Sequence, residues 1–202
     1  AAAPTRGHAR GRCGAVQLLV DRPIALLLGV ALPAIVGMAI LGRDLLALLA
    51  SPEFFPGAPL IAIIALGFLF MMLSSYYEVS LGLAHRQHLA AIGAGLAFAV
   101  NLVFNIILIP RFTILGAAVA TMLGFATQLG FARLMCERHR LIRSQWIFPL
   151  KVLACALALG VPVWLADLWL GPALVLFPLK VALGVAVFFL LSRLIALLPA
   201  GW

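Results

Sequence analysis

A series of long apolar segments without charged residues constrains this chain more than any other feature. No Asp, Glu, Lys or Arg occurs in residues 24–42, 54–77, 89–110 or 112–132. An α-helix needs about 20 apolar residues to cross the hydrocarbon core of a bilayer, and each segment is close to that length. Helices also satisfy their backbone polar groups within lipid. The sequence therefore predicts an all-α, polytopic transmembrane helix bundle.

The composition and the placement of charge agree with this fold class. Of the 202 residues, 65% are hydrophobic and 10% are charged, whereas soluble domains carry about 25% charged residues. The net charge is +8, and the basic residues lie at the ends of the apolar segments. That placement is typical of loops under the positive-inside rule and does not indicate nucleic-acid binding.

The order of apolar segments and turns predicts about six spans. We expect them at about 23–50, 58–84, 89–109, 113–135, 147–166 and 173–191, within a transmembrane region 23–198. Residues 1–22 are expected to form a cytoplasmic basic loop with a truncated start, because the chain opens without an initiator Met. The chain is therefore interpreted as a fragment.

Six spans distribute the basic residues very unevenly between the two sides. One side receives Arg6, Arg10, Arg12, Arg22, Arg86, Arg133, Arg138, Arg140, Arg143, Lys151 and Arg193, and the other receives Arg43, Arg111 and Lys180. The positive-inside rule then places both ends of the chain in the cytoplasm. The chain is therefore expected in a membrane that it crosses several times, with membrane lipids as surroundings.

Two spans carry small and polar residues at intervals of four. The third has Gly93, Ala97, Asn101 and Asn105, and the fourth has Gly116, Ala120, Gly124 and Gln128. Small residues let membrane helices approach closely, and amide side chains hydrogen-bond across the contact. The pattern therefore favours helix packing. A second interpretation is a substrate cavity lined by Asn101, Asn105, Thr121 and Gln128.

Glu78 and Lys180 are charged residues within predicted spans, where charge is costly and usually faces a partner or a wet cavity. Glu78 lies near the cytoplasmic end of its span, so it either forms a structural ion pair with Arg86 or another loop base, or couples transport to a proton or cation. Lys180 either extends its long stem to the interface or faces a phosphate group.

Motifs for metal binding and catalysis are missing from the sequence. His85 and His88 lie three residues apart without a third ligand nearby, which does not make a metal site. The three cysteines are scattered and form neither a disulfide framework nor a CxxC pair. No GxSxG, HExxH, P-loop or GxGxxG motif occurs. We therefore expect no enzyme activity, no metal and no cofactor.

Three sequence strings resemble a known family of transporters. They are Phe55-Pro56-Gly57-Ala58, the Gly-Leu plus basic link of residues 82–86, and NLVFNIILIPRFTILGAAVAT at residues 101–121. The last string is similar to the C-terminal half of bacterial polysaccharide flippases of the multidrug/oligosaccharidyl-lipid/polysaccharide exporter superfamily. The matching positions are Asn101, Asn105, Ile109, Pro110, Phe112, Gly116, Ala117, Ala118, Ala120 and Thr121. Thr113 stands where that family has Gly.

The resemblance implies a specific architecture and substrate, and it implies a location in the bacterial inner membrane. Six spans would be the larger part of the second bundle of a two-bundle exporter that flips an undecaprenyl-diphosphate-linked oligosaccharide for lipopolysaccharide, O-antigen or exopolysaccharide synthesis. The missing N-terminal bundle and the polysaccharide polymerase machinery would be its partners, and the two bundles would rock around a central site. Arg86, Arg111 and Lys180 are the candidates for holding the diphosphate.

Two alternatives accompany this hypothesis. One is a multidrug/cation antiporter or a peptidoglycan-precursor flippase of the same superfamily. The other is a membrane-embedded glycan polymerase or ligase, which should carry a large periplasmic loop with catalytic groups. Every predicted outer loop in this chain is short, so the sequence favours a transporter over an enzyme.

Overall fold

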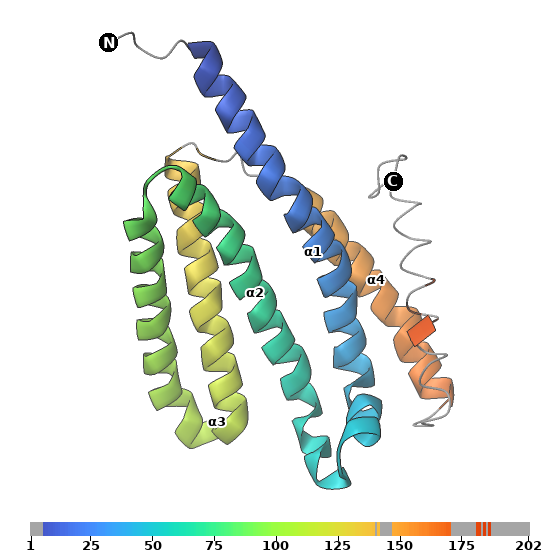
Figure 1. Cartoon of the computed structure of the whole chain (residues 1–202). Coiled ribbons are helices and arrows are strands. Elements are labelled where there is room, and N and C mark those ends of the chain that lie inside the picture. The colour runs from blue at the N-terminus through green and yellow to red at the C-terminus, as the bar shows by residue number, and fades with distance from the viewer. Residues whose placement is uncertain are drawn as a thin grey trace. The chain divides into compact units, whose positions relative to one another are not determined.

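Helices make up the whole of the regular structure in the part of the chain that the structure describes. The computed structural model describes residues 6–139, 141, 147–170, 181, 182, 184 and 186. The elements are α1 (Arg6–Leu49), the 3-10 helix η1 (Pro52–Gly57), α2 (Ala58–Leu83), α3 (Gln87–Arg138) and α4 (Ile147–Leu170) (Figure 1). The all-α prediction is confirmed for these residues. The sixth expected span, 173–191, lies almost wholly outside them.

Three helical segments are long and apolar enough to cross a membrane. They are Pro23–Leu49, Glu53–Leu83 and Gln87–Arg138. The last contains two of the predicted spans, because its 52 residues exceed what one crossing requires. These segments confirm a polytopic membrane protein, while the total of six spans stays a prediction.

The N-terminal part of α1 corrects one expectation. The sequence predicts a basic loop up to residue 22, but residues 6–22 are helical, and the apolar stretch begins within the same helix at Pro23. Charged residues keep a segment out of the hydrocarbon core, but they do not prevent that segment from being helical. Nine of the 17 residues 6–22 are Arg, Ala, Leu or Gln, which have high helix propensity, so the helix continues beyond its apolar stretch despite Gly7, Gly11 and Gly14.

The chain divides into two compact units. Unit 1 contains Ala1–Leu26 and Leu66–Ser144, and unit 2 contains Leu27–Ala65 and Gln145–Trp202. Both α1 and α2 therefore contribute residues to each unit.

In unit 1, α3 is a hairpin of two helical limbs. Thr113 interrupts the helix with φ 50° and ψ −122°, and Pro110 lies three residues before it. Proline removes a backbone hydrogen bond, and the positive φ at Thr113 reverses the chain. The limbs 87–112 and 114–138 fold back on each other (Figure 1), which confirms the turn predicted between the third and fourth spans.

Small residues form the contact between the two limbs. Gly93, Ala97, Gly116, Ala120 and Gly124 are all buried. A Cβ atom added at Gly124 would lie 3.0 Å from the Ala97 carbonyl oxygen, and one added at Gly116 would meet the Leu108 carbonyl oxygen. The backbones therefore approach as closely as glycine permits, as the four-residue spacing predicts.

The second limb also packs against α2. A Cβ atom at Gly67 would lie 3.4 Å from the Met122 Cα, and the rings of Phe68 and Phe125 lie 6.4 Å apart between centroids. Further along both helices, Leu81 and Cys136 form a fully buried cluster. Along these contacts the residue numbers of α2 and of the second limb increase together, so the two helices run parallel to each other.

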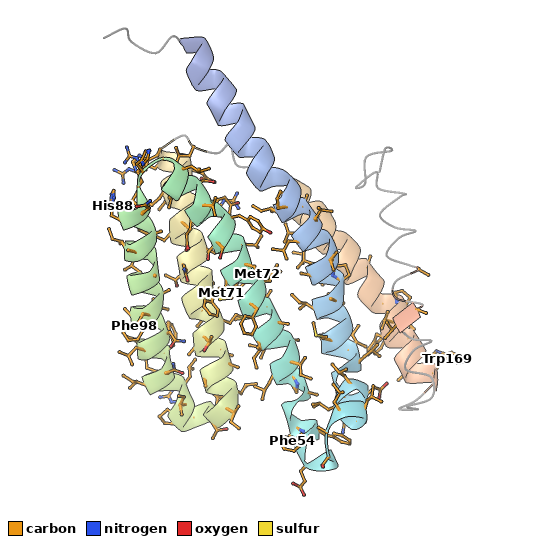
Figure 2. All side chains as sticks on the ribbon, in the orientation of Figure 1. Phe54, Met71, Met72, His88, Phe98 and Trp169 are labelled. Atoms are coloured by element: carbon orange, nitrogen blue, oxygen red, sulfur yellow. The ribbon has the colours of Figure 1, made fainter. Side chains whose placement is uncertain are left out.

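The first limb presents large apolar side chains on its outer surface. Phe98 and Ile106 are 68% and 67% exposed, and Phe98 points away from the rest of unit 1 in Figure 2. An apolar exterior of this kind suits contact with lipid and not with water.

Unit 2 is built around the contact between α1 and α4. Leu41 and Val163 are buried together, with Val36 and Ile40 packed against them. Gly160 of α4 provides the space, since a Cβ atom there would lie 3.2 Å from Val36 Cγ1. Proline-bearing α4 therefore packs through a small residue, as α3 does.

Replacing Thr113 by Gly should stabilise the protein. The positive φ strains a β-branched residue, and relief of that strain exceeds the added entropy of Gly in the unfolded chain, for a net gain of about 1 kcal/mol. Thr127→Gly is the matched control, because Thr127 lies within a helical limb, where glycine is less favourable than threonine by about 0.3 kcal/mol. Thermal unfolding in detergent should therefore move in opposite directions for the two variants. A lower melting temperature for Thr113→Gly would contradict the strained turn.

Methyl groups added at the limb contact should destabilise the hairpin. Gly116→Ala and Gly124→Ala should each lose about 1–3 kcal/mol through overpacking. Gly95→Ala and Gly130→Ala are the controls, because both glycines are exposed and a Cβ atom added at either would meet no neighbouring atom within 4 Å. Equal melting temperatures for all four variants would show that the limbs do not pack through these glycines.

Candidate functional site

Three polar side chains connect the two limbs of α3. Asn101 Nδ2 donates a hydrogen bond to Thr121 Oγ1 at 3.2 Å, and Asn105 Nδ2 donates one to Asn101 Oδ1 at 2.9 Å. Asn101 and Asn105 are half-buried, and Thr121 is exposed. An Asn side chain carries two N–H donors and two acceptor lone pairs, so these bonds use only part of its capacity. The group can join the limbs and still bind a polar ligand.

Gln128 does not belong to this group. Its Nε2 donates a hydrogen bond to Glu78 Oε1 on α2 at 2.8 Å. The physical reason is the helical repeat: residues four apart drift by about 40° per step, because a helix turns about 100° per residue. The stripe that begins at Gly116 has therefore rotated from the first limb toward α2 when it reaches Gln128. The four predicted cavity residues fall into two separate clusters.

Glu78 is a half-buried carboxylate five residues before the end of α2. Its hydrogen bond from Gln128 connects α2 to the second limb of α3. Ser74, one turn earlier, is fully buried, and its hydroxyl donates to the Met71 carbonyl of its own helix at 2.8 Å. Glu78 is therefore held at a helix contact that a change in its protonation or in a bound cation would alter.

The sequence pattern does not reveal the Gln128–Glu78 bond. The two residues lie 50 positions apart. The available signal is that each is a polar residue within an apolar span, where such residues usually find a partner.

Arg86 contacts a histidine at the end of α3. Its Nη1 lies 3.2 Å from His139 Nε2. A guanidinium has donors only, so His139 accepts through a neutral ring. The pKa of His139 lies below its ordinary value of 6.5 because of burial, and the nearby cations Arg86, Arg138 and His88 lower it further. The loops that follow α2 and α3 therefore meet at one end of unit 1.

The phosphate-facing candidates are not brought together. Arg86 precedes the first limb of α3 and Arg111 follows near its other end, a separation of about 40 Å at 1.5 Å per helical residue. One diphosphate cannot contact both. Lys180 lies outside the described residues.

Within the described ranges there is no group of three or more His, Cys, Asp or Glu side chains that could hold a metal ion. His85 has φ 57° in the turn between α2 and α3, and His88 is exposed in the first turn of α3. The described Cys136 is buried and donates through Sγ to the Tyr77 carbonyl at 3.3 Å.

Comparison with known proteins defines the family. The sequence model described as "Lipid II flippase MurJ" matches residues 5–183. The chain belongs to the lipid II flippase MurJ family. It is therefore a domain of a multi-pass membrane flippase family, a family of transporters and not of enzymes.

One relative matches part of the chain. The chain is 28% identical over 140 residues to the uncharacterized membrane protein MJ1068 of Methanocaldococcus jannaschii. The match covers 67% of this chain and 25% of that protein, so the chain spans about a quarter of the relative's length. No solved structure matches the chain.

The family assignment refines the prediction from the sequence. The resemblance to exporters of the multidrug/oligosaccharidyl-lipid/polysaccharide superfamily is confirmed at that level. Within the superfamily, the match supports the alternative of a peptidoglycan-precursor flippase over the polysaccharide flippase.

Acid should weaken the contact between Arg86 and His139. Because the folded-state pKa of His139 is lowered, its stability contribution is present above the unfolded pKa of about 6.5 and is lost as the pH falls below it. In the variant His139→Gln, the amide oxygen can still accept the hydrogen bond from Arg86, and the side chain has no proton to gain or lose in this pH range. Melting temperatures measured from pH 8 to pH 5 should therefore fall more steeply below about pH 6.5 in the parent protein than in the variant. Parallel curves would contradict this assignment.

Proposed function

We propose that this chain forms part of a flippase that moves a lipid-linked peptidoglycan precursor from the inner to the outer leaflet of the plasma membrane. The family match over residues 5–183 carries the proposal. The chain would supply about six spans, as the larger part of the second of two bundles. The remaining bundle would come from outside this chain, which is consistent with its covering a quarter of its relative's length.

The substrate sets the physical demand on such a protein. A diphosphate and its sugars must cross about 30 Å of hydrocarbon, so polar partners are required along the path. Asn101, Asn105 and Thr121 offer neutral donors and acceptors in otherwise apolar helices. We assign them to the cavity wall, where they would hydrogen-bond sugar or peptide groups while also joining the limbs of α3.

Charged groups would act nearer the membrane surfaces. Arg86 and Arg111 lie at opposite ends of the first limb of α3, so one diphosphate could contact only one of them at a time. Lys180 keeps its assignment as a phosphate-facing candidate. Cations that hold the diphosphate between the surfaces would belong to the other bundle.

Glu78 is the proposed coupling residue. Its carboxylate accepts the hydrogen bond from Gln128 and so joins two helices of unit 1. Proton or cation binding at Glu78 would change the strength of that bond, because hydrogen bonds to charged groups are stronger than neutral ones. Coupling would then bias the packing of α2 against α3.

A second substrate is favoured by a specific observation. The string at residues 101–121 resembles polysaccharide flippases, so an undecaprenyl-diphosphate-linked oligosaccharide remains the competing cargo, with polysaccharide polymerase as a partner.

Translocation of lipid II and of such an oligosaccharide should be compared in proteoliposomes that contain the full-length protein. We expect lipid II to be moved faster. Preference for the oligosaccharide would replace the proposed substrate, and movement of neither would reject the flippase.

Removing the charge at Glu78 should reduce coupled export. Glu78→Gln keeps the shape of the side chain but exchanges a charged hydrogen bond for a neutral one that is weaker by about 1 kcal/mol, and it removes the group that binds a proton or cation, so lipid II translocation by the full-length protein should fall about fivefold or more. Glu53→Gln is the control, because Glu53 is an exposed carboxylate in η1. Unchanged translocation by Glu78→Gln at every pH would leave Glu78 with a structural role only.

A further inference from the structure

Four basic side chains gather at one end of unit 1. This basic end cluster consists of Arg86, His88, Arg138 and His139. They come from the turn after α2, the first turn of α3, and its end. Figure 2 shows nitrogen atoms concentrated around the labelled His88, and the contact of Arg86 Nη1 with His139 Nε2 at 3.2 Å joins the two loops.

The cluster rests on an ordered base. Leu81 and Cys136 are fully buried beneath it, with Leu89 and Leu141 packed against them. The backbone N–H of Arg86 donates to the Leu81 carbonyl at 2.8 Å, and that of Leu141 donates to the Cys136 carbonyl at 2.9 Å. The loops are therefore held in place before any ligand arrives, which lowers the entropy cost of binding.

Positive charge dominates at this end. The groups that act electrostatically on His139 are all basic residues, namely Arg86, Arg138 and His88. The neighbouring carboxylate of Glu137 forms an ion pair with Arg133 Nε at 2.9 Å. Arg138 is exposed, so its charge is available to an anion, and the exposed ring of His88 can add a hydrogen-bond donor.

The cluster also lies at the depth of lipid phosphates. It occupies the ends of helices that are long enough to cross a membrane, and helix ends of this kind lie in the headgroup region. His88 is 13 residues before Asn101, or about 20 Å along the limb. An anion held at the cluster is therefore separate from the polar group assigned to the cavity wall.

We propose that the basic end cluster binds the headgroup of an anionic phospholipid from the adjoining leaflet. The phosphate oxygens accept hydrogen bonds from the guanidinium groups of Arg86 and Arg138, whose planar forks suit phosphate. His88 adds a third donor. His139 orients Arg86 through its ring nitrogen and acts as a positioning residue. Basic pockets between transmembrane helices commonly bind such headgroups.

Lipid retention by the full-length protein tests this site. The protein is purified in neutral detergent and titrated with phosphatidylglycerol or phosphatidylcholine, and bound lipid is counted by native mass spectrometry. The variants are Arg138→Gln and the double variant Arg86→Gln/Arg138→Gln. Arg43→Gln is the matched control, because Arg43 is an exposed arginine in α1 to which no phosphate contact is assigned.

The expected result is selective loss of the anionic lipid. Apparent affinity for phosphatidylglycerol should fall about threefold in Arg138→Gln and about tenfold in the double variant, with little change in Arg43→Gln or in phosphatidylcholine binding. If the double variant does not fold, Arg138→Gln alone decides the question, since its side chain is exposed. An equal loss in Arg43→Gln would show diffuse attraction and would reject a site.

Competition identifies the source of the phosphate. Inorganic phosphate at millimolar concentration should leave phosphatidylglycerol bound, because the lipid is also held by its acyl chains. Displacement by inorganic phosphate would indicate a site for free phosphate instead. Displacement by an equimolar polyprenyl diphosphate would assign the cluster to the transported substrate. Each of these two results would overturn the phospholipid proposal without affecting the proposed transport of lipid II.

Discussion

The close approach of the two limbs of α3 determines the rest of unit 1. Lipid offers no hydrophobic driving force between helices, so they associate through van der Waals packing and polar contacts. At Gly124 the facing Ala97 carbonyl oxygen would lie 3.0 Å from an added Cβ atom. This short separation brings Asn101 within hydrogen-bonding distance of Thr121. It also leaves the opposite side of the second limb free to pack on α2, where Gln128 reaches Glu78.

Much of this arrangement follows from local sequence. Apolar length predicts the helices, Pro110 predicts the turn, and four-residue spacing predicts the buried small residues. The start of α1 at Arg6 could not be read from charge, since a basic helix and a basic loop look alike in composition. The partners of Gln128 and Arg86 lie 50 and 53 residues away. Their identity depends on helix rotation and relative height, which no local pattern contains.

The string at residues 101–121 illustrates what a motif can and cannot specify. Pro110 and the interrupted helix at Thr113 build the turn, and Gly116 permits the limbs to meet beside it. Asn101 and Thr121 bond to each other across the contact. Most of the small and polar residues in the string are therefore used for folding a hairpin. A hairpin of this kind suits any cargo, so the string identifies the superfamily without selecting a polysaccharide or a peptidoglycan precursor.

Neutral and charged polar groups of unit 1 lie at different positions along its helices, and therefore at different expected depths in the membrane. Neutral amides and a hydroxyl occupy the middle of the α3 hairpin, whereas cations occupy its ends at Arg86, Arg138 and Arg111. Glu78 lies between these extremes, about 8 Å from the end of α2. The cost of a charged side chain rises toward the bilayer centre, and neutral hydrogen-bonding groups avoid that cost. A protein that moves a charged headgroup through lipid therefore gains by keeping its own charges near the surfaces. In such a protein, strong binding in the middle of the transport path would also hold the transported molecule there. Neutral hydrogen-bonding groups bind it weakly enough for it to be released.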